Sequence, residues 1–394
     1  MYCLTNRFYG IIIVAHHISY VKRSGEKRMK IVKIGDPEVV MSNPGSRHCY
    51  FGWPTVTRLQ NKKIAVVASG YRLRHVCPFG KCVISYSEDE GKTYTKPAVV
   101  IDTVLDDRDG GIMPFGESGV IVTSFNNTVN FQRSRATGGY DVAYLDLITP
   151  EEEASAIGSN FRISQDCGVT FGEIFKSPVT SPHGPTLLKN GAILWVGRTF
   201  SPDNTHRLGI DKIEAHRINP DGSTEYVGEI ENIQDGDTPP LSCEPHAIQL
   251  DDGTLLAHIR VHNKIGEKKY FTIFQSKSID EGASWSKPVQ ILENFGGAPA
   301  HLFKHSSGML ISTYSYRNEP YGIKVMFSSD NGNSWETGHY LYSEGLGIDL
   351  GYPSTVELSD GSLLTVFYAC TKNTDGMDAP TVIMQQRWRF ENEI

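Results

Sequence analysis

One pattern of residues occurs four times along this chain and limits its fold more than any other feature. Written Ser-x-Asp-x-Gly-x-Thr/Ser-aromatic, it appears as SEDEGKTY (87–94), SQDCGVTF (164–171), SIDEGASW (278–285) and SSDNGNSW (328–335). Asp280 and Asp330 lie about 50 residues apart, one repeat length, and a degenerate copy, INPDGSTEY (218–226), falls between the second and third copies. Repetition at this period predicts an architecture built from several copies of one structural unit.

Six segments alternate apolar and polar residues on both sides of a short polar turn, as two-stranded hairpins do. They are GWPTVTRLQNKKIAVVASGY (52–71), GGIMPFGESGVIVTSF (110–125), HGPTLLKNGAILWVGRTF (183–200), EPHAIQLDDGTLLAHIRVH (244–262), APAHLFKHSSGMLISTYSYR (298–317) and GYPSTVELSDGSLLTVFYA (351–369). Pairs such as Asn190-Gly191 and Asp252-Gly253 stand at hairpin tips, where positive φ is needed. No segment shows a sustained helical period, although TPEEEASAIG (149–158) predicts one short helix with Pro150 in its first turn.

The predicted fold class is therefore all-β. Six four-stranded repeats predict a six-bladed β-propeller, in which radial repetition protects the strand edges. We expect residues 29–394 to form this single domain, because no linker divides them. We expect residues 1–28 to be an N-terminal extension, with natural translation starting at Met29, because regular alternation begins at MKIVKIGDPEVV (29–40).

The repeated boxes are predicted to serve the scaffold. They lack the series of alternating carboxylates that a calcium loop needs, so no metal is expected in them. Their Asp and Ser side chains can bind the backbone of a tight turn, their Gly can adopt the left-handed conformation, and their aromatic residue can pack between neighbouring sheets.

The composition argues against several functional classes. The 38 basic and 45 acidic side chains are well mixed and give a net charge of −7, which argues against a nucleic-acid surface. Seven scattered cysteines lack the paired spacing of a zinc site and are predicted to be reduced and buried. The segment FYGIIIVA (8–15) is a poor signal peptide and too short to span a bilayer, so we expect a cytoplasmic protein with no membrane partner. No cofactor is implied, and the oligomeric state is not indicated.

The boxes together with the hairpins resemble the Asp-box repeats of the sialidase (neuraminidase) superfamily. The resemblance extends over nearly the whole chain, from about Gly35 to Trp388. It implies a six-bladed propeller and a glycosidase. Because Asp boxes also occur in propellers that are not sialidases, the resemblance implies the fold more strongly than the function.

Residues that precede or open each hairpin are the candidates for a site, because the innermost strands of all blades begin at one mouth of a propeller. A structural strand start does not need the charged and imidazole groups that this chain carries there: Asp107, Arg108, Asp109, His183, Glu244, His246, His301 and Tyr352. Their convergence would form a sugar-binding site.

Two hairpins resemble catalytic elements of sialidases. The segment CEPHAIQLDDGTLLAHIR (243–260) implies that Glu244 is the family's glutamate and that Arg260 belongs to its carboxylate-binding arginines. The segment GYPSTVELSDGSLLTVFY (351–368) implies that Tyr352 is the nucleophile. A neutral phenol activated by a glutamate avoids the repulsion between an anionic nucleophile and the carboxylate of a sialic acid. The alternatives are a strand-capping carboxylate for Glu244 and a core aromatic residue for Tyr352.

The first blade departs from the family pattern. Sialidases open it with Phe-Arg-Ile-Pro, whereas this chain has FGWP (51–54), so the leading arginine is replaced by Gly52. The following turn, SGYRLRHVCPFG (69–80), contains Arg72, Arg74 and His75 but no carboxylate for a general acid. Arg47 or Arg72 could replace the missing cation, and Arg317 is a further candidate for the arginine cluster, with a surface cation as its alternative.

The segment DDRD (106–109) could supply the general acid. In an extended strand, Asp107 and Asp109 share one face, whereas Asp106 and Arg108 share the other. We expect Asp107 or Asp109 to be the acid, although Arg108 beside it would lower the pKa of that carboxyl group, which is the wrong direction for an acid. A salt-bridged structural loop is the alternative.

The remaining candidates are aromatic and imidazole groups. Trp53 could stack on a sugar ring or fill the hydrophobic layer of the first blade. His75, His246 and His301, with His183, could form a polar subsite or ligate a metal, but isolated histidines at strand starts are more often hydrogen-bonded residents than ligands. We therefore predict no metal site.

The sequence predicts an exo-glycosidase that removes a terminal acidic sugar, sialic acid or a related one, from a glycan, with Tyr352 as nucleophile and Glu244 as base. One alternative is a hydrolase or lyase of the same fold that acts on a uronide, arabinoside or rhamnoside, which Gly52 and DDRD favour. The other is a non-catalytic propeller that only binds a glycan.

Overall fold

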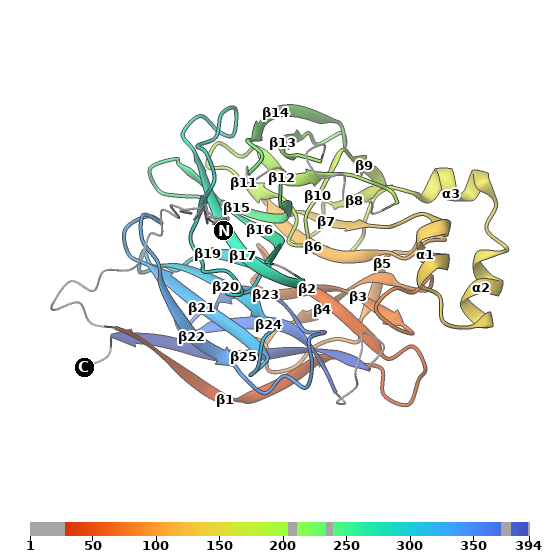
Figure 1. Ribbon diagram of the computed structural model, residues 1–394, viewed down its shortest axis with the longest axis horizontal. Helices are drawn as coiled ribbons and strands as arrows, with labels where there is room; N and C mark the ends of the chain where they lie inside the picture. Colours follow the sequence, from red (N-terminus) through yellow and green to blue (C-terminus); the bar gives the residue numbers. More distant parts are fainter. Residues whose placement is uncertain (1–27, 204–210, 234–238, 266, 372–379, 393–394) are drawn as a thin grey trace, which may run out of the picture.

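Six β-sheets surround a central axis in the computed structural model, which describes residues 28–203, 211–233, 239–265, 267–371 and 380–392 (Figure 1). Five sheets have four strands, and the third has a fifth, short strand. The inner strands of neighbouring sheets contact one another in order around the ring. The expected six-bladed β-propeller is therefore confirmed. The predicted N-terminal extension lies outside the described residues apart from Arg28.

The blades follow the chain in order. The first consists of β2 (Tyr50–Arg58), β3 (Ile64–Arg72), β4 (Lys81–Ser87) and β5 (Ala98–Ile101), and the second of β6 (Arg108–Phe115), β7 (Gly119–Phe125), β8 (Ser159–Ser164) and β9 (Phe175–Ser177). The third consists of β10 (Val179–Thr180), β11 (Thr186–Leu187), β12 (Ile193–Thr199), β13 (Ile213–Ile218) and β14 (Thr224–Ile230). The fourth consists of β15 (Leu241–Gln249), β16 (Leu255–Ile265), β17 (Lys268–Ser278) and β18 (Val289–Gln290), and the fifth of β19 (Ala300–Lys304), β20 (Leu310–Tyr316), β21 (Gly322–Ser328) and β22 (Glu336–Tyr342).

The sixth blade joins the two ends of the described chain. Its strands are β23 (Gly351–Glu357), β24 (Leu363–Cys370), β25 (Thr381–Asn392) and β1 (Met29–Met41), and β1 pairs antiparallel with β25 from Met29 opposite Asn392 to Met41 opposite Ile383. The first described strand is therefore the outermost strand of the last blade. This pairing closes the ring and sets the sixth blade beside the first.

The six predicted hairpins are the inner strand pairs of the six blades. Apolar side chains between adjacent blades form six separate buried clusters. One of them, for example, joins Val66 of the first blade to Val366 of the sixth. The alternation of apolar residues along each hairpin thus supplies the packing that holds the ring together.

The four boxes occupy the turn between the third and fourth strands of blades 1, 2, 4 and 5, and the degenerate copy occupies the same turn of blade 3. In the fifth blade, Ser328 Oγ donates to Asp330 Oδ1 (2.7 Å) and accepts the N–H of Gly332 (2.9 Å), while Asp330 accepts the N–H of Ser334 (2.9 Å). The same bonds recur in the other three full copies. The glycine is left-handed in all four, as predicted, with φ from 73° to 95°.

Three short helices follow β7 and precede β8 in the chain, and they lie at the outer edge of the propeller (Figure 1). They are α1 (Val129–Arg135), α2 (Gly139–Leu145) and α3 (Pro150–Ala156). Thr149 caps α3 in a capping box, which confirms the helix predicted from the sequence. The other two were not predicted because seven residues are too few to show a helical period. No helix in the described part of the chain is long and apolar enough to cross a membrane.

The inner strands of four blades share an irregularity at their first residues. Trp53, Asp109, Glu244 and Tyr352 have φ of 53°, 49°, 48° and 48°, in the left-handed region that costs a non-glycine residue free energy. The strand pairing skips residues at each of these points. A bulge of this kind breaks the alternation of faces and re-aims one side chain. At this position in four blades, the side chain therefore points in a different direction from the one that regular alternation along the strand would give it.

Replacing Ser328 with alanine is expected to lower the free energy of unfolding by about 1–3 kcal/mol, because the buried N–H of Gly332 would lose its acceptor. Urea denaturation at neutral pH measures this change. Ser155→Ala on the exposed face of α3 is the matched control, expected within about 0.5 kcal/mol of wild type. Equal stability of the two variants would contradict the structural role of the box.

The boxes should also make the fold sensitive to acid. Hydrogen bonds from Thr93 and Thr170 lower the pKa of Asp89 and Asp166 to about 2, below the usual value of an aspartate. A carboxyl group with a depressed folded-state pKa adds stability above its unfolded pKa and loses it as pH falls towards the folded value. Urea midpoints should therefore decrease between about pH 4 and pH 2, and Asp166→Asn should be less stable at pH 6 yet less sensitive to this change. An unaltered pH dependence in that variant would contradict the assignment.

Candidate active site

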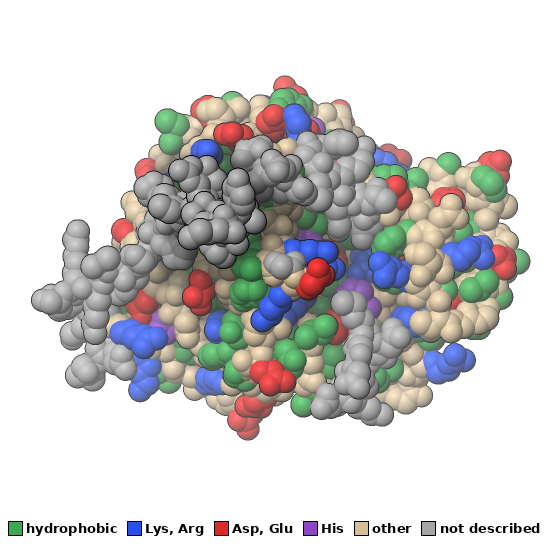
Figure 2. Space-filling view, viewed as in Figure 1, with side chains coloured by type: hydrophobic (Ala, Val, Ile, Leu, Met, Phe, Trp, Pro, Cys, Tyr) green, Lys and Arg blue, Asp and Glu red, His purple; other side chains and the backbone are tan. Residues whose placement is uncertain are grey.

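A cavity of about 220 Å³ opens where the inner strands begin. Its polar lining comes from all six blades: His75 from the first, Arg108 and Asp109 from the second, Thr180, Ser181 and Arg198 from the third, Glu244, Arg260 and His262 from the fourth, Arg317 from the fifth and Tyr352 from the sixth. On the face seen in Figure 2, basic side chains and an acidic one gather near the centre of the ring. Of the eight residues that the sequence predicts to converge, Arg108, Asp109, Glu244 and Tyr352 line this cavity.

Three predicted residues contact one another at this cavity. The hydroxyl of Tyr352 donates to Glu244 Oε1 at 2.7 Å. Arg260 Nη1 donates to Glu244 Oε2 at 2.6 Å and to the Tyr352 hydroxyl oxygen at 3.2 Å. β15, β16 and β23, from two blades that are not neighbours, bring these groups together across the axis.

The electrostatics of this trio fix its proton arrangement. Burial alone would raise the pKa of Glu244, but Arg260 and the hydrogen bond from Tyr352 outweigh it, so the pKa lies below the usual value of a glutamate. Burial, and then the charge of Glu244, raise the pKa of Tyr352 well above that of a free phenol. At neutral pH the pair is therefore a carboxylate that accepts the proton of a neutral phenol, which is the starting state for a glutamate base and a tyrosine nucleophile.

Asp109 lines the cavity, and its pKa differs from the one expected from the sequence. Burial raises its pKa to about 7, although Arg108, Arg72 and Arg260 act in the opposite direction. Its Oδ1 atom is buried and has no hydrogen-bond partner among the described residues. Arg108 lowers the pKa of Asp109, as predicted, but burial raises this pKa by more. Asp109 can therefore carry a proton near neutral pH.

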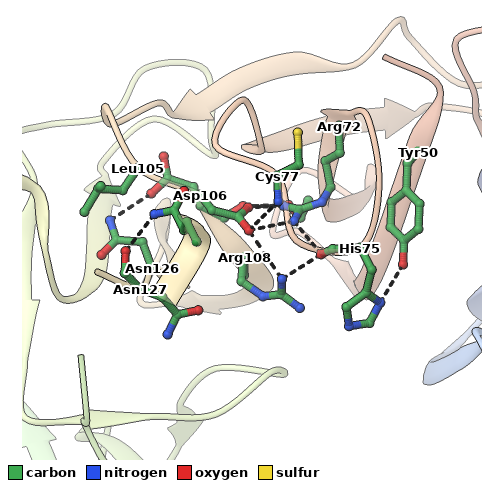
Figure 3. Close-up of polar contacts among 12 residues, drawn as sticks. Tyr50, Arg72, His75, Cys77, Leu105, Asp106, Arg108, Asn126 and Asn127 are labelled. Carbon is green, nitrogen blue, oxygen red and sulfur yellow. Dashed lines mark hydrogen bonds and ion pairs between the residues drawn. The ribbon is translucent and has the colours of Figure 1, made fainter. Parts of the chain in front are cut away.

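The other carboxylates of the DDRD segment do not line the cavity. Asp106 pairs with Arg72 at 2.5 Å and with Arg108 at 3.3 Å, and all three are shown in Figure 3. Asp107 accepts the N–H (2.6 Å) and the hydroxyl (3.1 Å) of Thr103 and does not line the cavity. The left-handed conformation of Asp109 separates it from Asp107, so the expected shared face does not form.

Two candidates from the first blade, Arg72 and Trp53, do not line the cavity. Arg72 is fully buried in its ion pair with Asp106, so it does not line the cavity in place of the missing arginine. Trp53 is 2% exposed and belongs to the core between the sixth and first blades. The guanidinium groups of Arg72 and Arg108 lie 4.8 and 4.2 Å from the centre of its ring. Trp53 therefore fills the hydrophobic layer rather than forming a stacking platform.

Arginines surround the remaining cavity wall. Arg317 donates to the carbonyl of Leu350 (3.2 Å) and, within the described chain, pairs with no carboxylate. Arg198, which sequence reasoning missed, pairs with Asp211 at 2.9 Å. It occupies the same place in β12 that Arg260 occupies in β16, five residues after the strand begins, so comparing hairpins three and four could have found it. The four guanidinium groups at the cavity exceed its two carboxyl groups.

His75 also lines the cavity, and its ring is held by a residue that was not predicted. Its Nδ1 lies 3.1 Å from Oδ1 of Asp349, which is buried just before β23. Asp349 also accepts the hydroxyls of Tyr50 and Tyr368, each at 2.8 Å. No sequence pattern connects Asp349 to His75, because their contact depends on the closure of the ring.

The other three histidines lie deeper along the axis, outside this cavity. His183, His246 and His301 pack with ring centres 4.4–5.4 Å apart and border a second cavity of about 200 Å³. Backbone N–H groups donate to Nδ1 of His246 (2.9 Å) and of His301 (3.3 Å), so the proton of each neutral ring sits on Nε2. Nε2 is then unable to ligate a metal, and no group of residues in the described chain is arranged to hold one.

The geometry thus brings together Tyr352, Glu244, Asp109, Arg260 and Arg317 with Arg108 and His75, and leaves Asp107, Arg72, Trp53, His246 and His301 outside the cavity. A proline follows three residues that line the cavity, Ser181, Glu244 and Tyr352. The same pattern occurs at Trp53 and Ala298, which do not line it, so a proline at the opening of a hairpin is only a partial signal for the cavity.

Comparison with solved structures shows the fold. A protein of unknown function from Dyadobacter fermentans superimposes with a TM-score of 0.68 at 18% identity, covering 92% of this chain and 99% of that one. The NanB sialidase of Streptococcus pneumoniae gives 0.64 at 12% identity, covering 89% and 70%. An α-L-arabinanase of Penicillium chrysogenum gives 0.60 at 14% identity, covering 90% and 98%. No curated protein matches the sequence.

The family model for the BNR repeat-like domain matches residues 149–365, which is more than half of the chain. This range includes three of the four full boxes and the trio at the cavity. The chain therefore belongs to the BNR repeat-like domain family and folds as a sialidase-like, six-bladed β-propeller.

Proposed function

We propose that this protein is an exo-glycosidase that hydrolyses the bond to a terminal acidic sugar whose anomeric carbon bears a carboxylate, as in sialic acid or a related sugar. The observation that carries the proposal is the hydrogen bond of 2.7 Å between Tyr352 and Glu244 beside Arg260, in a cavity lined by four arginines. The core tyrosines Tyr50 and Tyr368 also donate to a buried carboxylate, that of Asp349. Tyr352 differs from them because it lines the cavity and its hydroxyl oxygen also accepts a hydrogen bond from a guanidinium group.

The proposed chemistry proceeds in two steps. Glu244 takes the phenolic proton as the oxygen of Tyr352 bonds to the anomeric carbon, while the bond from that carbon to the leaving oxygen breaks and this oxygen takes a proton from an acid at the cavity. Water then gives a proton back to that acid as its oxygen bonds to the anomeric carbon, the bond to Tyr352 breaks, and Glu244 returns its proton to the phenol. A neutral nucleophile suits an anomeric carbon that carries a carboxylate, since two anions would repel each other.

The arginines would hold the carboxylate of the sugar. Arg317 has donors free of any carboxylate in the described structure, and Arg108 also faces the cavity. A guanidinium group offers paired donors that match the two oxygens of a carboxylate. Asp109, which can keep its proton near neutral pH, would donate a hydrogen bond to a sugar oxygen.

A second candidate is a hydrolase of the same fold that acts on a different sugar. The inner strand of the first blade supplies no arginine to the cavity, since Gly52 stands at the expected position and Trp53 is buried. The similar structures include an arabinanase as well as sialidases. This candidate predicts cleavage of neutral pentosides or uronides and no cleavage of sialosides.

Tyr352→Phe should reduce turnover at least about 1,000-fold, because it removes the nucleophilic oxygen. Hydrolysis of a chromogenic panel of sialosides, uronides, arabinosides and rhamnosides measures this, with Glu244→Gln tested in parallel. Tyr340→Phe is the matched control, since its hydroxyl lies near the surface and donates to the carbonyl of Pro320. Near-normal turnover by Tyr352→Phe would refute the mechanism. Saturable glycan binding with no product from any protein would show a binding module instead.

Arg317→Gln should raise the KM for a substrate with a carboxylate by about 10- to 100-fold, the loss of one charge-assisted contact. Arg389→Gln, an exposed arginine paired with Glu391, should leave the KM unchanged. The comparison uses one carboxylate substrate and its methyl ester. Equal KM changes for acid and ester would argue against carboxylate recognition by Arg317.

A further inference from the structure

His75 stands at the cavity on the side opposite Glu244, and its placement is set by the first and sixth blades together. It belongs to the loop between β3 and β4, whereas Asp349 precedes β23. Asp349 Oδ1 lies 3.1 Å from His75 Nδ1, and Asp349 Oδ2 accepts the hydroxyl of Tyr50 at 2.8 Å. The hydroxyl oxygen of Tyr50 also lies 3.0 Å from His75 Nδ1, a contact drawn in Figure 3. Tyr50, His75 and Asp349 therefore form one polar cluster.

Hydrogen bonds to its backbone carbonyl and packing against its imidazole ring also fix the position of His75. Its carbonyl accepts Arg72 Nη2 at 2.7 Å and Arg108 Nη1 at 2.6 Å. The ring packs edge to face against Trp53, with centres 5.0 Å apart. The imidazole therefore has one fixed orientation, and 21% of the side chain remains exposed at the cavity.

Asp349 determines which nitrogen of His75 carries the proton. An ionised carboxylate only accepts hydrogen bonds, so the Nδ1 atom that faces it must donate. Nε2 on the opposite edge is then free to hold a lone pair or to receive a second proton. A histidine oriented by a buried carboxylate in this way can exchange protons with a bound substrate.

We propose that His75 is the acid and base that acts on the leaving-group oxygen, with Asp349 as its positioning residue. This inference rests on the proposed glycosidase function. In the first step, the imidazolium Nε2–H gives its proton to the glycosidic oxygen as the bond from that oxygen to the anomeric carbon breaks and the Tyr352 oxygen bonds to that carbon. In the second, neutral Nε2 takes a proton from water, the water oxygen bonds to the anomeric carbon, and the bond to Tyr352 breaks.

The location of the other acidic groups supports this assignment. The loop RLRHVCPFG (72–80) contains no carboxylate, and His75 is its residue at the cavity. Asp109 is influenced by the charges of Arg108 and Arg72 as well as by those of Glu244 and Arg260, and its Oδ1 atom has no hydrogen-bond partner among the described residues that would orient it as Asp349 orients His75. Asp109 then serves as a hydrogen-bond donor, and His75 protonates the leaving group.

The charges around His75 set the direction of its pH dependence. Burial lowers its pKa below the usual value of a histidine, and Arg108 and Arg72 add to this lowering, whereas Asp349 opposes it. Tyr50 and Tyr368 face it through Asp349 and are neutral. Because the first step needs the protonated form, kcat/KM should fall as pH rises through a pKa below about 6.5.

The experiment compares two glycosides of the same sugar, one with a dinitrophenyl leaving group and one with a methyl leaving group, over pH 4–8. His75→Gln is expected to lose at least about 100-fold on the methyl glycoside and less than about 10-fold on the dinitrophenyl glycoside, which departs without protonation. In this variant, kcat/KM for the methyl glycoside should no longer fall as the pH rises. Asp349→Asn should change the pH at which kcat/KM falls. Asp109→Asn should lower the rates on the methyl and dinitrophenyl glycosides by the same factor.

Equal losses on both glycosides, or a selective loss in Asp109→Asn instead, would overturn the role of His75 and leave the proposed function standing. A wild-type protein that cleaves no glycoside of any sugar would overturn both. Nitrogen NMR of the wild-type protein gives a second measurement, independent of the stability of the variants. His75 is expected as the neutral tautomer with its proton on Nδ1, and a proton on Nε2 would contradict the pairing with Asp349.

Discussion

The pairing of β1 with β25 is the interaction on which the rest of the molecule depends. This antiparallel pair holds the first described strand in the last blade and so closes the series of sheets into a ring. Side-chain hydrogen bonds between the sixth and first blades, such as that from Thr381 Oγ1 to the carbonyl of Phe51 at 2.6 Å, reinforce the closure. Closure packs Val66 against the apolar side chains of the sixth blade. It also sets Asp349 beside His75, although 274 positions separate them along the chain. The geometry of the cavity is thus a consequence of the outermost strand of one blade.

Charge balance gives the cavity its chemical character. Asp106 neutralises Arg72 below the surface and partly neutralises Arg108, while Glu244 pairs with Arg260. Buried ions of opposite sign compensate each other's loss of hydration, which allows several guanidinium groups to gather in a small space. Arg317 is left with neutral partners in the described structure, so the cavity favours an anion there. The same burial that makes ions costly keeps a proton on Asp109 near neutral pH.

The sequence sufficed for the fold because the repeated boxes and hairpins are local signals that recur in every blade or nearly so. It also identified Tyr352, Glu244 and Arg260, which meet because each opens or ends an inner hairpin. It did not separate Asp109 from Asp107, because the assumed alternation fails where the backbone becomes left-handed. Asp349 was not found because no pattern in the sequence around it indicates a contact with His75. Local pattern therefore predicted the scaffold, whereas contacts across the ring needed coordinates.

The left-handed backbone of Trp53, Asp109, Glu244 and Tyr352 has a consequence for how such a propeller can change over evolution. Glycine adopts this conformation without the clash that a side chain incurs, a difference of about 1–2 kcal/mol at each position. Drift under selection for stability alone would tend to place glycine at Asp109, Glu244 and Tyr352, whereas it would keep Trp53, whose buried ring fills the core between the sixth and first blades. A chain that keeps large side chains at the first three positions gives up folding free energy for them, so a relative with glycine at these positions would be a robust scaffold that has lost its chemistry.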